Sequence, residues 1–126
     1  MKRMPATSPT KYHLYIKPFQ SIVGKNFVFT DELTLNNYAQ DQTEDLLFPP
    51  DIVIKPKTTE EIAAIMKICN AHKIPVTPRG AGTGLSGGAL PQFGGVLLST
   101  ERLNTILHID EQNLQVTTEP GVITEV

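Results

Sequence analysis

A glycine-rich run at residues 78–89 holds the residue types in this chain that are best suited to chemistry. It reads Pro-Arg-Gly-Ala-Gly-Thr-Gly-Leu-Ser-Gly-Gly-Ala, with one cation, Arg79, and no carboxylate. Glycine permits positive φ, so successive N–H groups can point into one concavity, and no Cβ obstructs an anion that approaches the backbone. The run therefore predicts a diphosphate-binding site with the Arg79 charge at its mouth.

Two well-known nucleotide motifs fit these glycines less well. Residues 82–87 match the dinucleotide-binding pattern G-x-G-x-x-G, but that pattern requires a helix directly after the loop. Gly88, Pro91 and the pair Gly94-Gly95 follow instead, and such residues disfavour a helix. A P-loop needs a lysine at the position that Gly88 occupies. A glycine-rich linker without function is the remaining alternative.

Composition limits the classes of function. The 126 residues suit one domain, and 40% hydrophobic with 19% charged residues is ordinary for a soluble globular protein. A net charge of -2 gives no reason to expect nucleic acid as a partner, and no apolar run is long enough to predict a transmembrane segment. The three histidines and the single cysteine show no metal-ligand spacing, so we expect no metal site.

The first thirty residues contain no acid. Pro5, Pro9 and Pro18 disfavour the amphipathic helix of a mitochondrial transit peptide, and a secretory signal would need an apolar core that is missing here. We therefore expect residues 1–30 to be a frayed N-terminal extension and the protein to be cytoplasmic. The basic residues of this segment are Lys2, Arg3, Lys11, Lys17 and Lys25.

A helix with clear boundaries is expected before the glycine-rich run, from Thr58 to Lys73. Thr58 and Glu61 form a capping box at its start, and Pro75 lies beyond its end, with His72 and Lys73 in its last turn. We expect its apolar face to pack in the core, with Cys69 as a small buried hydrophobe. That face holds Ile62, Ile65, Met66 and Cys69.

The remaining elements place the run at the end of a strand. A strand at 51–55, the helix and a strand from Val76 form a βαβ unit, and ligands favour the carboxyl ends of such strands. A short helix at 31–38 precedes them. Further strands are expected at 96–99, 105–109 and 114–117, the last two joined by a hairpin turn through Asp110, Glu111, Gln112 and Asn113.

Three segments of the chain together resemble one protein family. Residues 51–62, 75–88 and 119–122 follow one another at the spacing of the FAD-linked oxidase family, typified by vanillyl-alcohol oxidase and p-cresol methylhydroxylase. The glycine-rich run looks most like the glycolate oxidase FAD subunit and D-lactate dehydrogenase branch. Tyr38 with Asp41 and Thr43 also resembles a segment of that branch.

The resemblance implies an α+β, p-cresol methylhydroxylase-type FAD-binding fold. It covers about residues 31–126, which would be the first subdomain of that fold, a βαβ unit followed by β-hairpins. Similar proteins continue through a second FAD-contacting segment and a substrate-binding cap. We therefore expect residues 31–126 to be the amino-terminal part of an FAD-binding domain that is truncated at Val126.

The resemblance also implies which residues contact the cofactor. In this family the run wraps the FAD pyrophosphate mainly through backbone N–H groups, and a Pro-Gly-Val segment lies near the flavin end. Some relatives attach FAD covalently through a histidine where this chain has Thr83, so non-covalent FAD is expected. The implied contacts are Arg79, Gly80, Ala81, Gly82, Thr83, Gly84, Leu85, Ser86, Pro120, Gly121 and Val122.

The implied activity is that of a whole enzyme. Such an enzyme oxidises a D-2-hydroxy acid of the glycolate or D-lactate type to the 2-oxo acid by hydride transfer to FAD. We expect no catalytic residue within this chain, since His108 reads as an ordinary strand histidine. The chain alone is expected to be inactive and prone to self-association. The alternative is a stand-alone nucleotide- or phosphate-binding module without catalysis.

Overall fold

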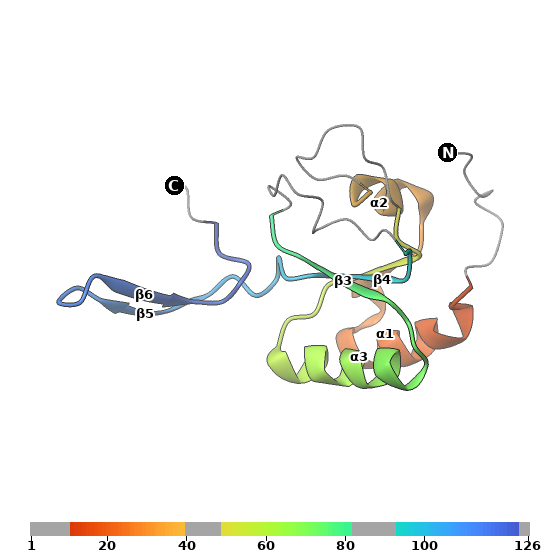
Figure 1. The fold of residues 1–126 in the computed structure, drawn as a ribbon, viewed down its shortest axis with the longest axis horizontal. Helices are drawn as coiled ribbons and strands as arrows, with labels where there is room; N and C mark the ends of the chain where they lie inside the picture. The colour runs from red at the N-terminus through yellow and green to blue at the C-terminus, as the bar shows by residue number, and fades with distance from the viewer. Residues whose placement is uncertain (1–10, 40–48, 82–92, 124–126) are drawn as a thin grey trace.

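A four-stranded sheet with helices on both faces, and a hairpin that projects from it, make up the chain (Figure 1). The computed structural model describes residues 11–39, 49–81 and 93–123. Helices α1 (Ile16–Val23) and α3 (Thr59–Ala71) lie on one face of the sheet, and α2 (Glu32–Asn37) lies on the other (Figure 1).

The N-terminal segment is part of the core. Its elements are η1 (His13–Tyr15), α1 (Ile16–Val23), η2 (Lys25–Phe27) and β1 (Val28–Phe29). Phe19 in α1 is fully buried, and Tyr12 and Val23 are buried beside it. The expectation of a frayed extension is therefore wrong for residues 11–29.

Pro18 predicts against a helix in this segment, but the structure accommodates it. It is the third residue of α1, in the first turn, where a backbone N–H has no partner within the helix and a proline is tolerated. The helix ends at Gly24, whose φ of 96° is readily adopted by glycine, and the chain turns from there into β1.

The strand order of the sheet is β1-β2-β4-β3. Strands β2 (Ile52–Ile54), β3 (Val76–Arg79) and β4 (Val96–Ser99) are parallel, and β1 pairs antiparallel with β2. Every residue of β2 and β4 is buried, which explains their continuous apolar runs. The predicted βαβ unit is present, but β4 lies between its two strands, an insertion that the sequence did not predict.

The helix α3 (Thr59–Ala71) begins at the predicted cap. The Thr58 hydroxyl accepts a hydrogen bond from the Glu61 N–H at 3.1 Å, and the Glu61 carboxylate reaches back to accept from the Lys57 N–H at 2.6 Å. The far end differs from the prediction, because the helix ends at Ala71. His72 is its C-cap, and Lys73 lies beyond it with a φ of 54°.

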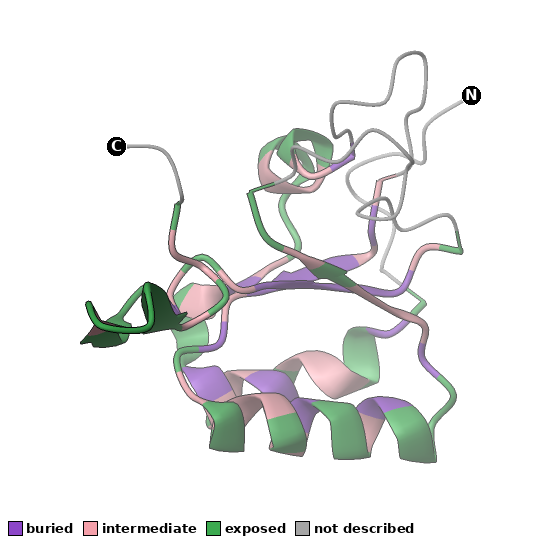
Figure 2. Cartoon of the chain, turned by 60° about the vertical axis from the view of Figure 1, so that its left-hand side comes forward, coloured by how far each residue is buried: buried purple, intermediate pink, exposed green. Residues whose placement is uncertain are grey.

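The buried face of α3 is centred on Ile65 and Cys69 (Figure 2). Ile62 and Ile68 pack against the same core cluster, which also includes Phe19 from α1. Met66 is 42% exposed, so its predicted place in the core is wrong. The core therefore lies between the sheet and the pair α1 and α3.

The helix α2 (Glu32–Asn37) matches the short helix expected there. The Asp31 carboxylate caps it, accepting hydrogen bonds from the Thr34 N–H at 3.0 Å and the Thr34 hydroxyl at 2.7 Å. These bonds lower the pKa of Asp31. Tyr38 is the C-cap of this helix, and its hydroxyl bonds Glu101, which follows the last residue of β4, Ser99, by two positions.

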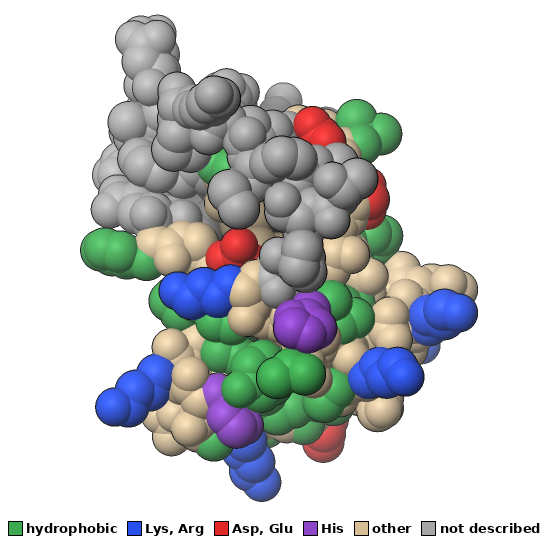
Figure 3. Space-filling view, turned by 90° about the vertical axis from the view of Figure 1, so that its right-hand side faces the viewer, with side chains coloured by type: hydrophobic (Ala, Val, Ile, Leu, Met, Phe, Trp, Pro, Cys, Tyr) green, Lys and Arg blue, Asp and Glu red, His purple; other side chains and the backbone are tan. Residues whose placement is uncertain are grey.

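The strands β5 (Ile106–Asp110) and β6 (Gln115–Thr118) form the predicted hairpin. It projects away from the sheet (Figure 1). Its apolar side chains are exposed, with Leu114 at the turn 91% exposed. Among the described residues on the face in Figure 3, basic side chains stand at separate points of the surface.

Candidate functional site

The carboxyl ends of three parallel strands meet at one edge of the sheet. Lys55 follows β2, Gly80 and Ala81 follow β3, and Thr100 and Glu101 follow β4. Ligands in parallel α/β arrangements bind outside this edge. The first residues of the glycine-rich run thus stand where a ligand site is expected.

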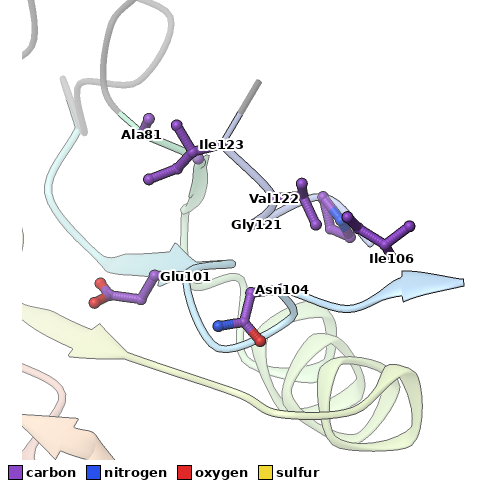
Figure 4. A pocket seen from close by; sticks show the side chains of 9 residues that line it. Ala81, Glu101, Asn104, Ile106, Gly121, Val122 and Ile123 are labelled. Carbon is purple, nitrogen blue, oxygen red and sulfur yellow. The ribbon is translucent and has the colours of Figure 1, made fainter. Parts of the chain in front are cut away.

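A cavity of about 370 Å³ opens beside this edge (Figure 4). Its lining comes from the residues that follow β3, from the segment between β4 and β5 with the first residue of β5, and from the segment after β6. The residues are Gly80, Ala81, Glu101, Asn104, Ile106, Pro120, Gly121, Val122 and Ile123. Much of this wall is apolar or backbone, and Figure 4 labels Ala81 and Ile123 among the side chains that line it.

The cavity brings together two of the segments that the sequence singled out. Gly80 and Ala81 from the glycine-rich run face the segment 120–122, forty positions further along the chain. The remaining predicted contacts, residues 82–86, lie outside the described residues. Arg79 is the last residue of β3 and stands next to the lining without belonging to it.

Close packing requires a glycine at position 121. Its N–H donates a hydrogen bond to the Leu103 carbonyl at 2.6 Å. A Cβ on Gly121 would overlap the Thr100 carbonyl oxygen and would stand 2.6 Å from the Leu103 carbonyl oxygen. Glycine is thus needed to bring the segment 120–122 against the turn that follows β4, a structural role that the sequence did not predict.

Gly80 presents the opposite case. A Cβ built on Gly80 meets no atom within 4 Å, so the backbone there is open to the cavity. The carbonyl of its neighbour Arg79 is fixed by two donors from Thr100, the N–H at 2.9 Å and the hydroxyl at 3.1 Å. A fixed backbone with open space above it fits a site that a phosphate group approaches closely.

A polar group at the same edge was not predicted from the sequence. We call it the Glu101 cluster, and it consists of Tyr38, Lys55, Ser99 and Glu101. The Tyr38 and Ser99 hydroxyls both donate to the Glu101 Oε1, the latter at 2.7 Å, while Lys55 Nζ lies 3.4 Å from Oε2. Its members come from the end of α2, the end of β2 and the end of β4, and the sequence did not predict that they meet.

Charges within the Glu101 cluster balance. Burial alone would raise the pKa of Glu101, but the hydrogen bonds from Tyr38 and Ser99 and the Lys55 ammonium outweigh it and lower that pKa. Burial, together with the Glu101 carboxylate, raises the pKa of Tyr38. For Lys55, burial would lower the pKa, but Tyr38 and Glu101 outweigh it and raise the value. At neutral pH the cluster therefore holds one anion, one cation and a protonated phenol.

The Arg79 guanidinium lies over the Tyr38 ring, with its Cζ 5.2 Å from the ring centroid. Lys55 Nζ lies 5.5 Å from the same centroid and 4.9 Å from that of Phe29. Such distances suit cation–π contacts. The Glu101 cluster thus reaches the one cation of the glycine-rich run.

Other kinds of site find no support in the described part of the chain. No three His, Cys, Asp or Glu side chains there are grouped so that they could hold a metal ion. The helices within those ranges are too short or too polar to cross a bilayer. The cavity at the sheet edge is therefore the candidate site.

Two solved structures share this fold. p-Cresol methylhydroxylase with substrate bound gives a TM-score of 0.79 at 28% identity, over 91% of this chain and 23% of its own. 4-Ethylphenol oxidase from Gulosibacter chungangensis gives 0.76 at 31% identity, over 95% and 24%. The predicted p-cresol methylhydroxylase-type fold is confirmed.

A sequence model described as FAD binding domain matches residues 50–126, more than half of the chain. This chain belongs to the FAD binding domain family. The match contains all the residues that line the cavity, and it confirms FAD as the cofactor. The individual contacts with FAD and its non-covalent attachment stay predictions.

Curated relatives agree with the branch that the glycine-rich run resembles. Glycolate oxidase subunit GlcD of Bacillus subtilis is 48% identical over 87 residues, which cover 69% of this chain and 18% of the relative. D-lactate dehydrogenase of Anaerostipes hadrus is 39% identical over 113 residues, 86% and 23% respectively. The chain therefore spans about a fifth of the length of these relatives.

Proposed function

We propose that this chain is the FAD-binding portion of a flavin-dependent oxidoreductase that oxidises a D-2-hydroxy acid to the 2-oxo acid. The observation that carries the proposal is the cavity in which Gly80 and Ala81 meet the segment 120–122. The glycolate oxidase subunit and D-lactate dehydrogenase among the relatives support the substrate class.

The described residues fit the cofactor by their chemistry. Gly80 offers a backbone N–H group without a side chain, Ala81 adds only a methyl group, and Arg79 supplies a permanent positive charge for the diphosphate. Pro120 and Val122 give an apolar wall for the flavin end. When bound, FAD accepts the hydride, and the protein's part is to hold and orient it.

This chain contributes binding and no catalytic residue in the proposed enzyme. His108 lies on the exposed hairpin, where it pairs with Thr117 across the ladder. The groups that hold the hydroxy acid and accept its hydroxyl proton would come from other parts of the protein. We place the enzyme in the cytoplasm with a small-molecule substrate and no nucleic acid partner.

The test is the flavin content of the protein at its natural length. We expect visible flavin absorbance after purification, release of FAD on denaturation because Thr83 cannot form a histidyl bond, and bleaching by D-lactate or glycolate without oxygen. Gly82→Val should abolish FAD retention with the fold intact. Release of a colourless nucleotide would instead support the non-catalytic binding module.

A further inference from the structure

We infer that Tyr38 is a positioning residue for Arg79 and that Glu101 fixes Tyr38 for this purpose. The inference rests on the proposed function, since the ligand of Arg79 is taken to be the diphosphate of FAD. Tyr38 lies before the part of the chain that the family model matches. The structure therefore adds a segment to the site that the match does not include.

The chain of contacts starts at the turn after β4. Glu101 accepts a hydrogen bond from the Tyr38 hydroxyl, which joins residues 63 positions apart. Ser99 holds the same carboxylate oxygen, and Lys55 holds the other. A phenol whose hydroxyl is bound by an anchored carboxylate is held in place at the sheet edge, so its ring stays within reach of a cation.

Arg79 is the cation on that face. Its backbone is fixed by Thr100, and its guanidinium carbon lies 5.2 Å from the Tyr38 centroid. An arginine side chain loses much rotamer freedom when it binds an anion, and prior ordering reduces that cost. The ring thus keeps the guanidinium at the same edge of the sheet as Glu101, which bonds Tyr38 and lines the cavity.

Electrostatic repulsion between the Glu101 carboxylate and an anionic ligand is offset. Lys55 balances the Glu101 charge. In Figure 4 the Glu101 side chain also points away from Val122 and Ile106, on the other side of the cavity. Glu101 therefore faces Tyr38 and Lys55, and the cavity keeps the positive charge of Arg79 nearby.

The test is a double-mutant cycle in the protein at its natural length, freed of flavin and titrated with FAD by fluorescence quenching. We expect Tyr38→Leu to weaken FAD binding about tenfold and Tyr38→Phe, which keeps the ring, only about threefold. In the Arg79→Ala background, Tyr38→Leu should have no further effect. Equal weakening in both backgrounds would overturn the inference, because Tyr38 would then act without Arg79.

A second measurement separates this inference from the proposed function. The Arg79 side-chain N–H resonance should carry a ring-current shift that Tyr38→Leu removes, whether or not FAD binds. Lys57→Ala, which leaves the Glu101 cluster intact, is the control and should keep the shift. If the protein shows this shift but has no affinity for FAD, the proposed function is refuted and the contact between Tyr38 and Arg79 still holds. If Tyr38→Leu leaves the Arg79 resonance unchanged, the positioning role is refuted.

Discussion

Gly121 packs so tightly against Thr100 that a Cβ on Gly121 would overlap the Thr100 carbonyl oxygen. The contact joins the segment after β6 to the turn after β4, and so it closes one wall of the cavity. Gly80, on the facing wall, has free space where a Cβ would go. Two glycines of one site therefore meet different physical demands.

These demands predict opposite effects for the same substitution. Gly121→Ala should lower the free energy of unfolding by about 3 kcal/mol, because backbone oxygens cannot move aside easily. Gly80→Ala should leave that free energy nearly unchanged and weaken FAD binding, since its methyl group would occupy space that the diphosphate needs. Chemical denaturation and FAD titration of both variants check this. Unchanged FAD affinity in Gly80→Ala would contradict a close approach of the ligand.

The N-terminal helix should contribute strongly to stability. Phe19→Ala removes a fully buried ring and should cost about 3–5 kcal/mol in the free energy of unfolding. Leu14→Ala, at a site that is 73% exposed in the preceding 3₁₀ helix, is the matched control and should cost less than about 0.5 kcal/mol. Similar losses in the two variants would show that α1 does not pack as described.

The Cys69 thiol should be inert in the folded protein. Burial raises its pKa to about 11, so the thiolate is scarce at neutral and mildly alkaline pH. Because the pKa is lower in the unfolded chain, the thiol favours folding below that lower value and loses this effect as the pH rises towards 11. Ellman's reagent at pH 8 should react only after denaturant is added. Rapid labelling of the native protein would contradict the burial of Cys69.

The exposed hairpin should cause the 126-residue chain to associate with itself. Ile109 and Val116 pair directly on one face of the hairpin, and both are more than half exposed. Exposed apolar surface of this kind favours association. Val116→Lys should reduce the apparent mass in light scattering, whereas Thr117→Lys adds the same charge on the opposite face and should change it little. A monomer in the unaltered chain would disprove this.

The Glu101 cluster should make stability depend on pH in the acid range. The pKa of Glu101 is lower in the folded protein than its ordinary value of about 4.3. Its contribution is therefore complete above the ordinary value and is lost as the pH falls through the lower, folded value. Glu101→Gln should flatten the loss of thermal stability in that interval. A melting curve with the same pH dependence as the unaltered protein would count against the cluster.

Local signals predicted local structure well. The cap at Thr58, the apolar run of β4 and the turn between β5 and β6 each depend on residues close in sequence, and each was predicted. The insertion of β4 between β2 and β3 depends on pairing between distant segments, for which the sequence holds no local signal.

The same distinction applies to the site. The glycine-rich run was evident from its composition, and a family resemblance singled out Pro120 and Gly121 as residues near the flavin end. Glu101 could not be predicted, because a lone carboxylate after a strand has no distinctive spacing. It gains its role only when folding brings Tyr38 to it from 63 positions away.

The central place of β4 also sets an order of events in the growing chain. Before Val96 is synthesised, β1 and β2 can form their short antiparallel pair, but β3 has no neighbour, because its only ladder in the described sheet is with β4. Pairing between segments far apart in sequence is slow, and unpaired strand edges invite aggregation. During synthesis on the ribosome, the edge of β3 therefore stays unpaired until the glycine-rich run and β4 have been synthesised. The segment that we propose binds the cofactor thus also delays the closing of the sheet.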